Sequence, residues 1–173
     1  MKKLTKYLSV GLLVAASAAS FTVNAAIVEL GNLSGTYANT FERSAGAFID
    51  NIKFSITTPS NLGSAANHLD LSFNIPGIGN VDLYNITGMY YNITGPGSFT
   101  TGTLSADNTT HSTILNVAGD YQVNLFGNAT GTKGGLYAVA LNVTAVPEPE
   151  TYALMLAGLG LVGFAARRRK SAV

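Results

Sequence analysis

Apolar and polar residues alternate with a period of two in four segments of the chain, 48–56, 69–75, 121–125 and 137–143. Gly, Asn, Pro and Ser residues gather between these segments. Strict alternation is typical of strands with one buried face. Less regular strands are expected at 81–87, 89–94 and 113–117. Seven or eight short strands in about 120 residues predict an all-β fold, an antiparallel β-sandwich over residues 26–145.

Turn residues identify how some of these strands are connected. Residues 75–80 include Pro76 and two glycines and are expected to join two strands, because Pro fixes φ and Gly accepts positive φ. Residues 127–135 are expected to form a long hairpin loop between the last two strands. Tyr121 begins a strand after a Gly-Asp pair. Its hydroxyl is expected to fold back onto the preceding loop, as in the tyrosine corners of β-sandwiches.

Asp50 does not fit the pattern around it. It shares the period-two face of Phe48, Ile52 and Phe54, which is expected to point inward. A carboxylate on a core face is costly unless it is hydrogen-bonded. The structural interpretation places Asp50 at the start of the strand, where it accepts hydrogen bonds from loop N–H groups. The functional interpretation makes it a calcium ligand together with neighbouring carbonyls. The sequence favours the structural one, since no second acidic residue lies nearby.

The N-terminal 25 residues have the pattern of a secretory signal peptide. Three lysines in the first six residues precede an apolar stretch, 7–19, and the small residues Val23 and Ala25 stand at the −3 and −1 positions of a cleavage site. This pattern predicts cleavage between Ala25 and Ala26 and export of the rest of the chain.

The C-terminal residues 146–173 combine three elements. A Pro-Glu-Pro motif is followed by an apolar run, 152–166, and then by a basic cluster; the motif and cluster residues are Val146, Pro147, Glu148, Pro149, Arg167, Arg168, Arg169 and Lys170. A helix over 152–166 would be about 22 Å long, short of the roughly 30 Å hydrocarbon core. The pattern therefore predicts a transmembrane sorting helix that spans the membrane transiently, with the basic residues in the cytoplasm.

Composition narrows the function classes. Residues 26–145 contain three basic and seven acidic residues, a net charge of −4, which argues against nucleic-acid binding. The absence of cysteine from the sequence excludes disulfides, thiolate metal sites and cysteine nucleophiles.

Candidate catalytic and cofactor motifs are weak. Residues 127–133 approximate a phosphate-binding loop, but the spacing is one residue short and no helix is expected after it. His68 and His111 are 43 residues apart, and a zinc or general-base site needs more converging ligands. No Gly-x-Ser-x-Gly elbow is present, and the acidic residues are scattered singly. We therefore expect no enzyme activity, no cofactor and no metal.

The C-terminal motif, short apolar helix and arginine run together resemble a PEP-CTERM sorting signal. That resemblance implies a Gram-negative bacterium that makes exopolysaccharide, and an exosortase-type protease that recognises the Pro-Glu-Pro motif. It implies a domain held outside the cytoplasm by an inner-membrane helix, then moved to the cell surface or medium after processing. The rest of the chain resembles the FxDxA subgroup of such proteins. Phe48-Ile49-Asp50 supplies its F-x-D, and residues 118–137 match the segment before the tail, while Ile52 stands where the subgroup has Ala.

These observations favour an exported, non-enzymatic protein of the cell surface or of the exopolysaccharide matrix of a biofilm. The alternative is a carbohydrate-binding or adhesive module, in which exposed Tyr90, Tyr91 and Tyr137 stack on sugar rings. Tyrosines on strands more often pack in the core, so core packing is the favoured interpretation of these three residues. A hydrolase is the least favoured hypothesis, since it would need acidic residues that converge in a cleft.

Overall fold

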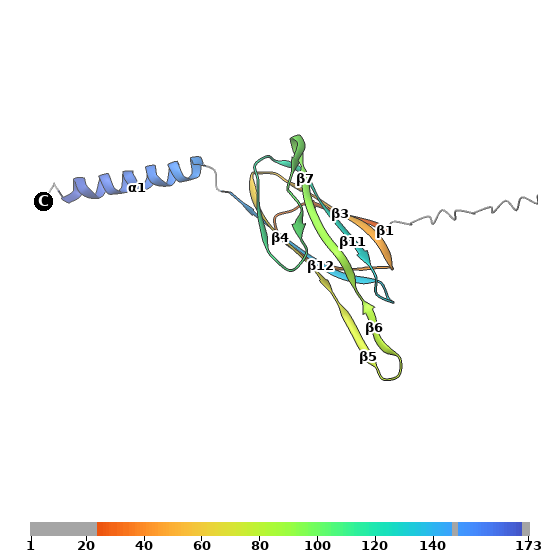
Figure 1. The fold of residues 1–173 in the computed structure, drawn as a ribbon. Coiled ribbons are helices and arrows are strands. Elements are labelled where there is room, and N and C mark those ends of the chain that lie inside the picture. The colour runs from red at the N-terminus through yellow and green to blue at the C-terminus, as the bar shows by residue number, and fades with distance from the viewer. Residues whose placement is uncertain (1–23, 147–148, 171–173) are drawn as a thin grey trace, which may run out of the picture.

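The computed structural model describes residues 24–146 and 149–170, which form twelve strands, a short 3₁₀ helix and an α-helix (Figure 1). The prediction of a mostly β domain is confirmed. The predicted signal peptide lies outside the described residues except for Asn24 and Ala25, which begin the first strand.

The larger sheet, sheet A, contains β1 (Asn24–Asn32), β3 (Gly46–Ile56), β7 (Ile86–Gly95), β8 (Phe99–Thr100), β9 (Leu104–Ser105) and β11 (Gly119–Ala129). Its order is β1-β3-β11-β7-β8, and β9 also pairs with β7. The 3₁₀ helix, Pro96–Ser98, connects β7 to β8. β1 and β3 run parallel, so the purely antiparallel prediction is wrong for this pair. The strand between them in the sequence, β2 (Gly35–Arg43), belongs to the other sheet. The chain therefore returns to sheet A in the same direction as β1.

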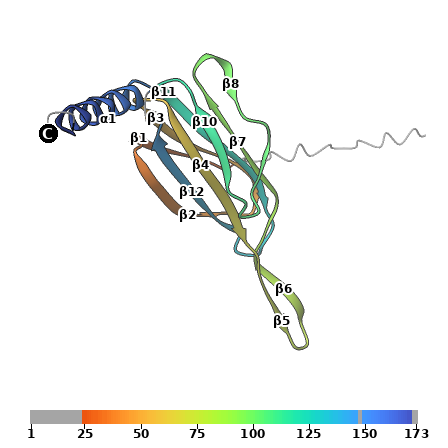
Figure 2. The ribbon, with the colours of Figure 1, turned by 90° about the vertical axis from the view of Figure 1, so that its left-hand side faces the viewer.

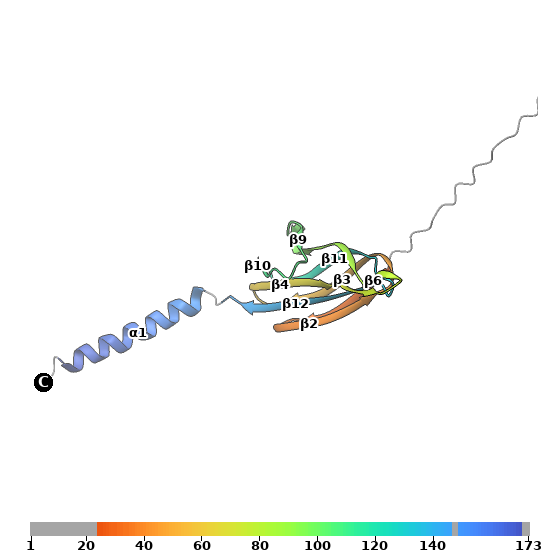
Figure 3. The same cartoon turned by 60° about the horizontal axis from the view of Figure 1, so that its bottom comes forward.

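The second sheet, sheet B, contains β2 (Gly35–Arg43), β4 (Ser60–Leu69), β10 (His111–Leu115) and β12 (Gly135–Ala145). Its order is β10-β4-β12-β2, and all its pairs are antiparallel. Figure 3 shows β4, β12 and β2 side by side in this layer. β1, β2 and β4 were not predicted. Small or polar residues occupy most inward positions of β4, and most of β2 is exposed, so neither strand shows a clear apolar alternation.

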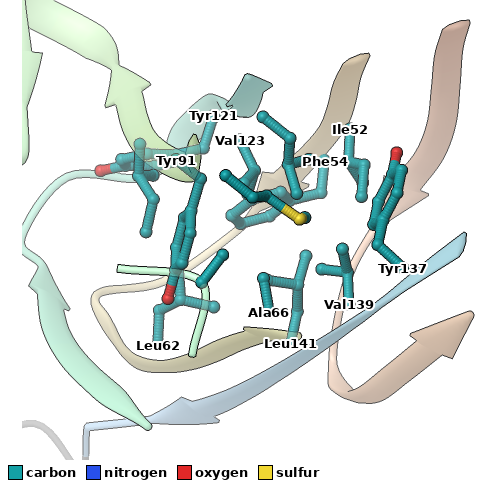
Figure 4. Close-up of a cluster of buried hydrophobic side chains, with 14 of the residues drawn as sticks. Ile52, Phe54, Leu62, Ala66, Tyr91, Tyr121, Val123, Tyr137, Val139 and Leu141 are labelled. Atoms are coloured by element: carbon teal, nitrogen blue, oxygen red, sulfur yellow. The ribbon is translucent and has the colours of Figure 1, made fainter. Parts of the chain in front are cut away.

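The core lies between the two sheets. Figure 4 shows Ile52, Phe54 and Val123 of sheet A facing Leu62, Ala66, Val139 and Leu141 of sheet B. The inward faces predicted for β3, β11 and β12 are confirmed, since their apolar alternate residues are buried. The hydroxyl of Tyr121 donates to the Val117 carbonyl at 2.7 Å, which is the geometry expected of a tyrosine corner.

A two-stranded hairpin, β5 (Leu71–Ile75) and β6 (Gly79–Tyr84), projects beyond the two sheets (Figure 2). The predicted turn at 75–80 is confirmed: the Ile78 N–H donates to the Ile75 carbonyl at 3.0 Å. The predicted burial of the apolar side chains of 69–75 is wrong, because β5 pairs with β6 alone. Leu69, Phe73 and Ile75 are 46%, 50% and 40% exposed.

The glycine-rich segment after β11 connects the two sheets and does not form the predicted hairpin loop. β11 continues to Ala129 in sheet A, and β12 begins at Gly135 in sheet B. Backbone N–H groups of residues 130–133 donate to the carbonyls of Asp82, Leu83 and Asn85. The N–H groups of this segment are therefore used in hydrogen bonds to carbonyls at the end of β6. They do not converge on one point, as the N–H groups of a phosphate-binding loop do.

The C-terminal helix α1 runs from Pro149 to Lys170 and is longer than the predicted 152–166. Proline is favourable at the first helical position, Glu150 suits the positive helix N-terminus, and basic residues suit the C-terminus, so the helix extends over both flanks. Residues 149–151, which precede the predicted helix, are therefore helical. Among the described residues, no helix combines the length and apolar character needed to cross a membrane.

Candidate functional site

The outward face of sheet A carries a row of three asparagines on adjacent strands. Asn124 of β11 lies opposite Asn51 of β3 on one side and opposite Asn92 of β7 on the other. All three side chains point away from the core, because they alternate with buried residues along each strand. They are only half-buried. Amide side chains from three separate parts of the chain therefore meet on one surface.

Hydrogen bonds fix these amides relative to one another. Asn124 Nδ2 donates to Asn92 Oδ1 at 2.8 Å and to Thr94 Oγ1 at 3.3 Å. Gln122 Nε2 donates to Asn51 Oδ1 at 3.0 Å and also to Asn124 Oδ1. Within the described part of the chain, the amide nitrogens of Asn51 and Asn92 donate to no side chain, so both retain hydrogens to offer. The row is thus an ordered set of donors and acceptors.

An aromatic pair lies beside the asparagine row. Phe126 and Tyr90 are opposite each other on β11 and β7, and their rings stack with centroids 5.1 Å apart and an interplanar angle of 18°. Tyr90 is 42% exposed. Two residues along a strand separate the pair from the asparagines, a distance of about 7 Å. A stacked aromatic pair and a polar row therefore adjoin.

A cleft of about 690 Å³ lies at the other end of this face, beyond Gln122. Its charged lining residues are Glu29, Lys53 and Asp120. Lys53 Nζ lies 3.5 Å from Glu29 Oε1, and both side chains are exposed, so this ion pair contributes little to stability. We refer to the asparagine row, Gln122, Thr94, the Tyr90–Phe126 pair and this cleft together as the amide face.

Asp50 lies in the middle of β3 and is 2% exposed. Its Oδ1 accepts the backbone N–H of Ala26 at 2.8 Å, and its Oδ2 accepts Arg43 Nε at 2.6 Å and the hydroxyl of Tyr137. The predicted partners, loop N–H groups at a strand start, are therefore replaced by one strand N–H and two side chains. Phe48 is 1% exposed and stacks on Tyr137 at 5.4 Å. We call Asp50, Arg43, Tyr137 and the Ala26 nitrogen the Asp50 cluster.

The electrostatics of the Asp50 cluster keep Tyr137 neutral and Arg43 charged. Burial raises the pKa of the Tyr137 hydroxyl, and its hydrogen bond to Asp50 raises it further. Burial acts to lower the pKa of the Arg43 guanidinium, but the hydrogen bond to Asp50 and the nearby negative charge outweigh it, so the pKa lies above its ordinary value. Asp50 and Arg43 therefore form an ion pair with little solvent contact.

The calcium interpretation of Asp50 has no support from its neighbours. Its oxygens face a guanidinium, a hydroxyl and an N–H, which are all donors. Among the described residues, no group of three or more His, Cys, Asp or Glu could hold a metal ion. His68 Nε2 lies 3.4 Å from Asp70 Oδ2. His111 lies at the start of β10 opposite Ser64, so the two histidines do not form a common site.

The predicted processing residues flank the domain. Ala25 and Ala26 lie in β1 opposite Ile49 and Asp50. Val146 follows β12 and donates its N–H to the Pro59 carbonyl at 3.0 Å. Pro147 and Glu148 lie outside the described residues, and Arg167, Arg168, Arg169 and Lys170 fall in the last turns of α1.

The adhesive alternative needs Tyr90, Tyr91 and Tyr137 to be exposed, and this holds for Tyr90 alone; the favoured interpretation, core packing, is confirmed for the other two. Tyr91 and Tyr137 are 1% exposed and pack in the core. The asparagine row was not predicted. Alternation places Asn51, Asn92 and Asn124 on outward faces, but only strand order shows that they are adjacent.

Comparison with known proteins identifies the tail. Residues 145–170 match the PEP-CTERM protein-sorting motif. No curated protein matches the chain. Among solved structures, the chain is similar to the Aeromonas hydrophila periplasmic inhibitor of g-type lysozyme, with 9% identity, a TM-score of 0.45, and coverage of 69% of this chain and 99% of that one. It is also similar to the pre-peptidase C-terminal domain of a Bacillus anthracis collagenase, with 15% identity, a TM-score of 0.37, and coverage of 66% and 93%.

Proposed function

We propose that this chain, which carries a PEP-CTERM sorting motif, is a non-enzymatic protein of the cell surface or extracellular matrix. We propose further that its amide face binds polysaccharide. The motif indicates an exported protein processed by an exosortase-type system. The observation that carries the binding proposal is the ordered asparagine row beside the Tyr90–Phe126 pair, of which Tyr90 is exposed.

This surface has the chemistry that a sugar ring requires. A pyranose presents C–H groups on one face, which pack on aromatic rings, and hydroxyls around its edge. Amide side chains offer both donors and acceptors to hydroxyls, and the negative faces of aromatic rings attract C–H groups. Neighbouring strands are about 4.8 Å apart, so three asparagines span about 10 Å, comparable to a disaccharide. Because the row is uncharged, we propose a neutral polysaccharide as the ligand.

The tail supports a transient membrane stage. The apolar side chains of α1 between residues 152 and 164 are all exposed; among them Leu154, Leu161 and Val162 are 80%, 71% and 68% exposed. An exposed apolar surface of this kind is unfavourable in water. We propose that the inner membrane surrounds α1, with the domain outside the cytoplasm, until an exosortase-type protease removes the tail.

Removing the Tyr90 ring or the central asparagine should weaken polysaccharide binding. We expect Tyr90→Ala and Asn124→Ala each to raise the Kd for the exopolysaccharide of the producing cell about fivefold, since stacking and a lost hydrogen bond are each worth about 1 kcal/mol. Isothermal titration calorimetry measures the change, with the thermal midpoint of each variant checked in parallel.

Tyr84→Ala is the matched control, because Tyr84 lies on β6 away from the amide face and bonds Glu42. It should bind as the parent does. Absence of binding to any neutral polysaccharide on a glycan array would refute the binding proposal, and release of new reducing ends would refute the non-enzymatic one.

Processing should depend on the Pro-Glu-Pro motif. We expect mass spectrometry of the exported protein to find the C-terminal residues, including Val173, removed in cells that have the exosortase and retained in cells that lack it. Pro147→Ala together with Pro149→Ala should retain them in both strains, whereas Pro76→Ala, in the β5–β6 turn, should leave processing unchanged. An intact Val173 in both strains for the parent chain would contradict the proposal.

A further inference from the structure

We propose that cleavage between Ala25 and Ala26 creates an α-ammonium group that forms an ion pair with the buried carboxylate of Asp50, so that removal of the leader completes the Asp50 cluster. This inference rests on the proposed function, because it requires export and leader removal. It goes beyond it by assigning Asp50 as the receptor site for the new chain end.

The geometry places the two atoms together in the described structure. Ala26 lies opposite Asp50 in the parallel β1–β3 pair, and its backbone nitrogen is 2.8 Å from Asp50 Oδ1. Arg43 and Tyr137 bond the other carboxylate oxygen, Oδ2. Asp50 Oδ1 therefore accepts a hydrogen bond from the Ala26 nitrogen, the atom that the predicted cleavage would make the N-terminal amine.

Cleavage changes the chemistry of this contact without moving it. The Ala26 nitrogen is a neutral amide with one hydrogen before the cut and an ammonium with three hydrogens and a positive charge after it. Hydrogen bonds between charged partners are roughly twice as strong as neutral ones. Asp50 is 2% exposed, so water screens the new ion pair weakly.

The charges around the site balance with the ammonium in place. Asp50 on β3 is negative, Arg43 on β2 is positive, and Tyr137 on β12 stays neutral because its pKa is raised. Glu42 on β2 lines a small cleft together with Arg43, Ser44, Asn24 and Ala25. Before cleavage these groups sum to one negative charge, which the ammonium neutralises. Loss of Asn24 and Ala25 opens that cleft to the remaining ammonium hydrogens.

The position of the cut matters because of strand register. Successive residues of a strand point to opposite sides of a sheet. A chain that begins at Ile27 lacks the nitrogen that contacts Asp50, and a chain that begins at Ala25 keeps it as a neutral amide. Only a chain that begins at Ala26 brings a charged terminus to this carboxylate.

N-terminal acetylation tests the inference, because it keeps the N–H donor and removes the charge. Mature protein isolated from exporting cells would be acetylated on its α-amine while unfolded, refolded, and compared with the untreated protein by denaturant unfolding. At pH 7 we expect acetylation to lower the ratio of folded to unfolded protein about tenfold. This corresponds to an α-ammonium pKa that is about one unit higher in the folded protein than in the unfolded chain. Protein acetylated on a lysine in place of the α-amine is the matched control and should keep the parent ratio.

The pH dependence follows from the direction of the shift. A carboxylate partner raises the α-ammonium pKa in the folded protein above its ordinary value of about 8. The extra stability is then fully present below pH 8 and is lost as the pH rises through the folded-state pKa. The difference between free and acetylated protein should therefore vanish near pH 10. Titration of the ¹⁵N-labelled Ala26 amine by NMR reads the same pKa without any variant.

The outcomes separate this inference from the proposed function. An exported protein that begins at any residue other than Ala26 overturns the inference alone. So does one that begins at Ala26 but has an ordinary α-amine pKa and unchanged stability on acetylation. A protein that stays in the cytoplasm with residues 1–25 attached overturns both proposals.

Discussion

Replacing Asp50 by Asn should lower the free energy of unfolding by about 3–5 kcal/mol, the usual cost of removing one partner from a buried ion pair. The side chains of Asp50 and Arg43 are 3% and 15% exposed, so the substitution leaves a guanidinium with little solvent and no counter-charge at 2.6 Å. It also weakens the contact to Tyr137, whose hydroxyl bonds the same oxygen. Urea unfolding followed by circular dichroism measures the loss.

Glu29→Gln is the matched control for this prediction. Glu29 also pairs with a cation, Lys53, but at 3.5 Å and with its side chain 73% exposed. Its replacement should change stability by less than about 1 kcal/mol. If the two variants unfold at the same urea concentration, the Asp50 cluster is not a structural centre of the domain.

Gly134→Ala should destabilise the domain by about 4 kcal/mol, at the upper end of what single substitutions do. Gly134 has φ +99°, where an L-residue is strained, and a β-carbon there would overlap the carbonyl oxygen of Arg43. That carbonyl is backbone at the end of β2, so it cannot rotate aside. Displacing it would also disturb the guanidinium that bonds Asp50.

Gly79→Ala separates strain from overlap. Gly79 has φ +101°, nearly the same conformation, but no atom lies within 4 Å of the position that an added β-carbon would take. It should therefore cost only the conformational penalty, about 1–2 kcal/mol. The difference between the two thermal midpoints isolates the overlap at Gly134. Equal midpoints would show that the inter-sheet connection can relax around an added methyl group.

Alternation along the chain predicted the buried faces of β3, β11 and β12, because their inward positions hold large apolar side chains. It failed for β4, where Ser60, Ser64 and Ala66 occupy buried positions. It also misassigned 69–75. Phe73 and Ile75 share a face as predicted, but a period of two says only which side chains share a face and not whether another layer covers it.

Asp50 was recognisable as discordant from its position among Phe48, Ile52 and Phe54, but its partners were not. Ala26, Arg43 and Tyr137 come from three other strands, and sequence spacing does not show which strands adjoin. The same reason hid the asparagine row. Short-range signals were more reliable: the turn at 75–80 and the Tyr121 hydroxyl depend on residues only three or four positions apart.

The position of β12 determines how the domain responds to tension. Val146 follows β12 directly, so a pull on the tail enters the domain along this strand. β12 is paired with β4 over Leu136–Ala145 and with β2 over Gly135–Val143. A pull along the strand axis must shear both ladders at once and cannot open them one bond at a time. Resistance to such a pull is governed by the unfolding barrier, so the domain is suited to bearing a force applied at its C-terminal end while the tail is still attached.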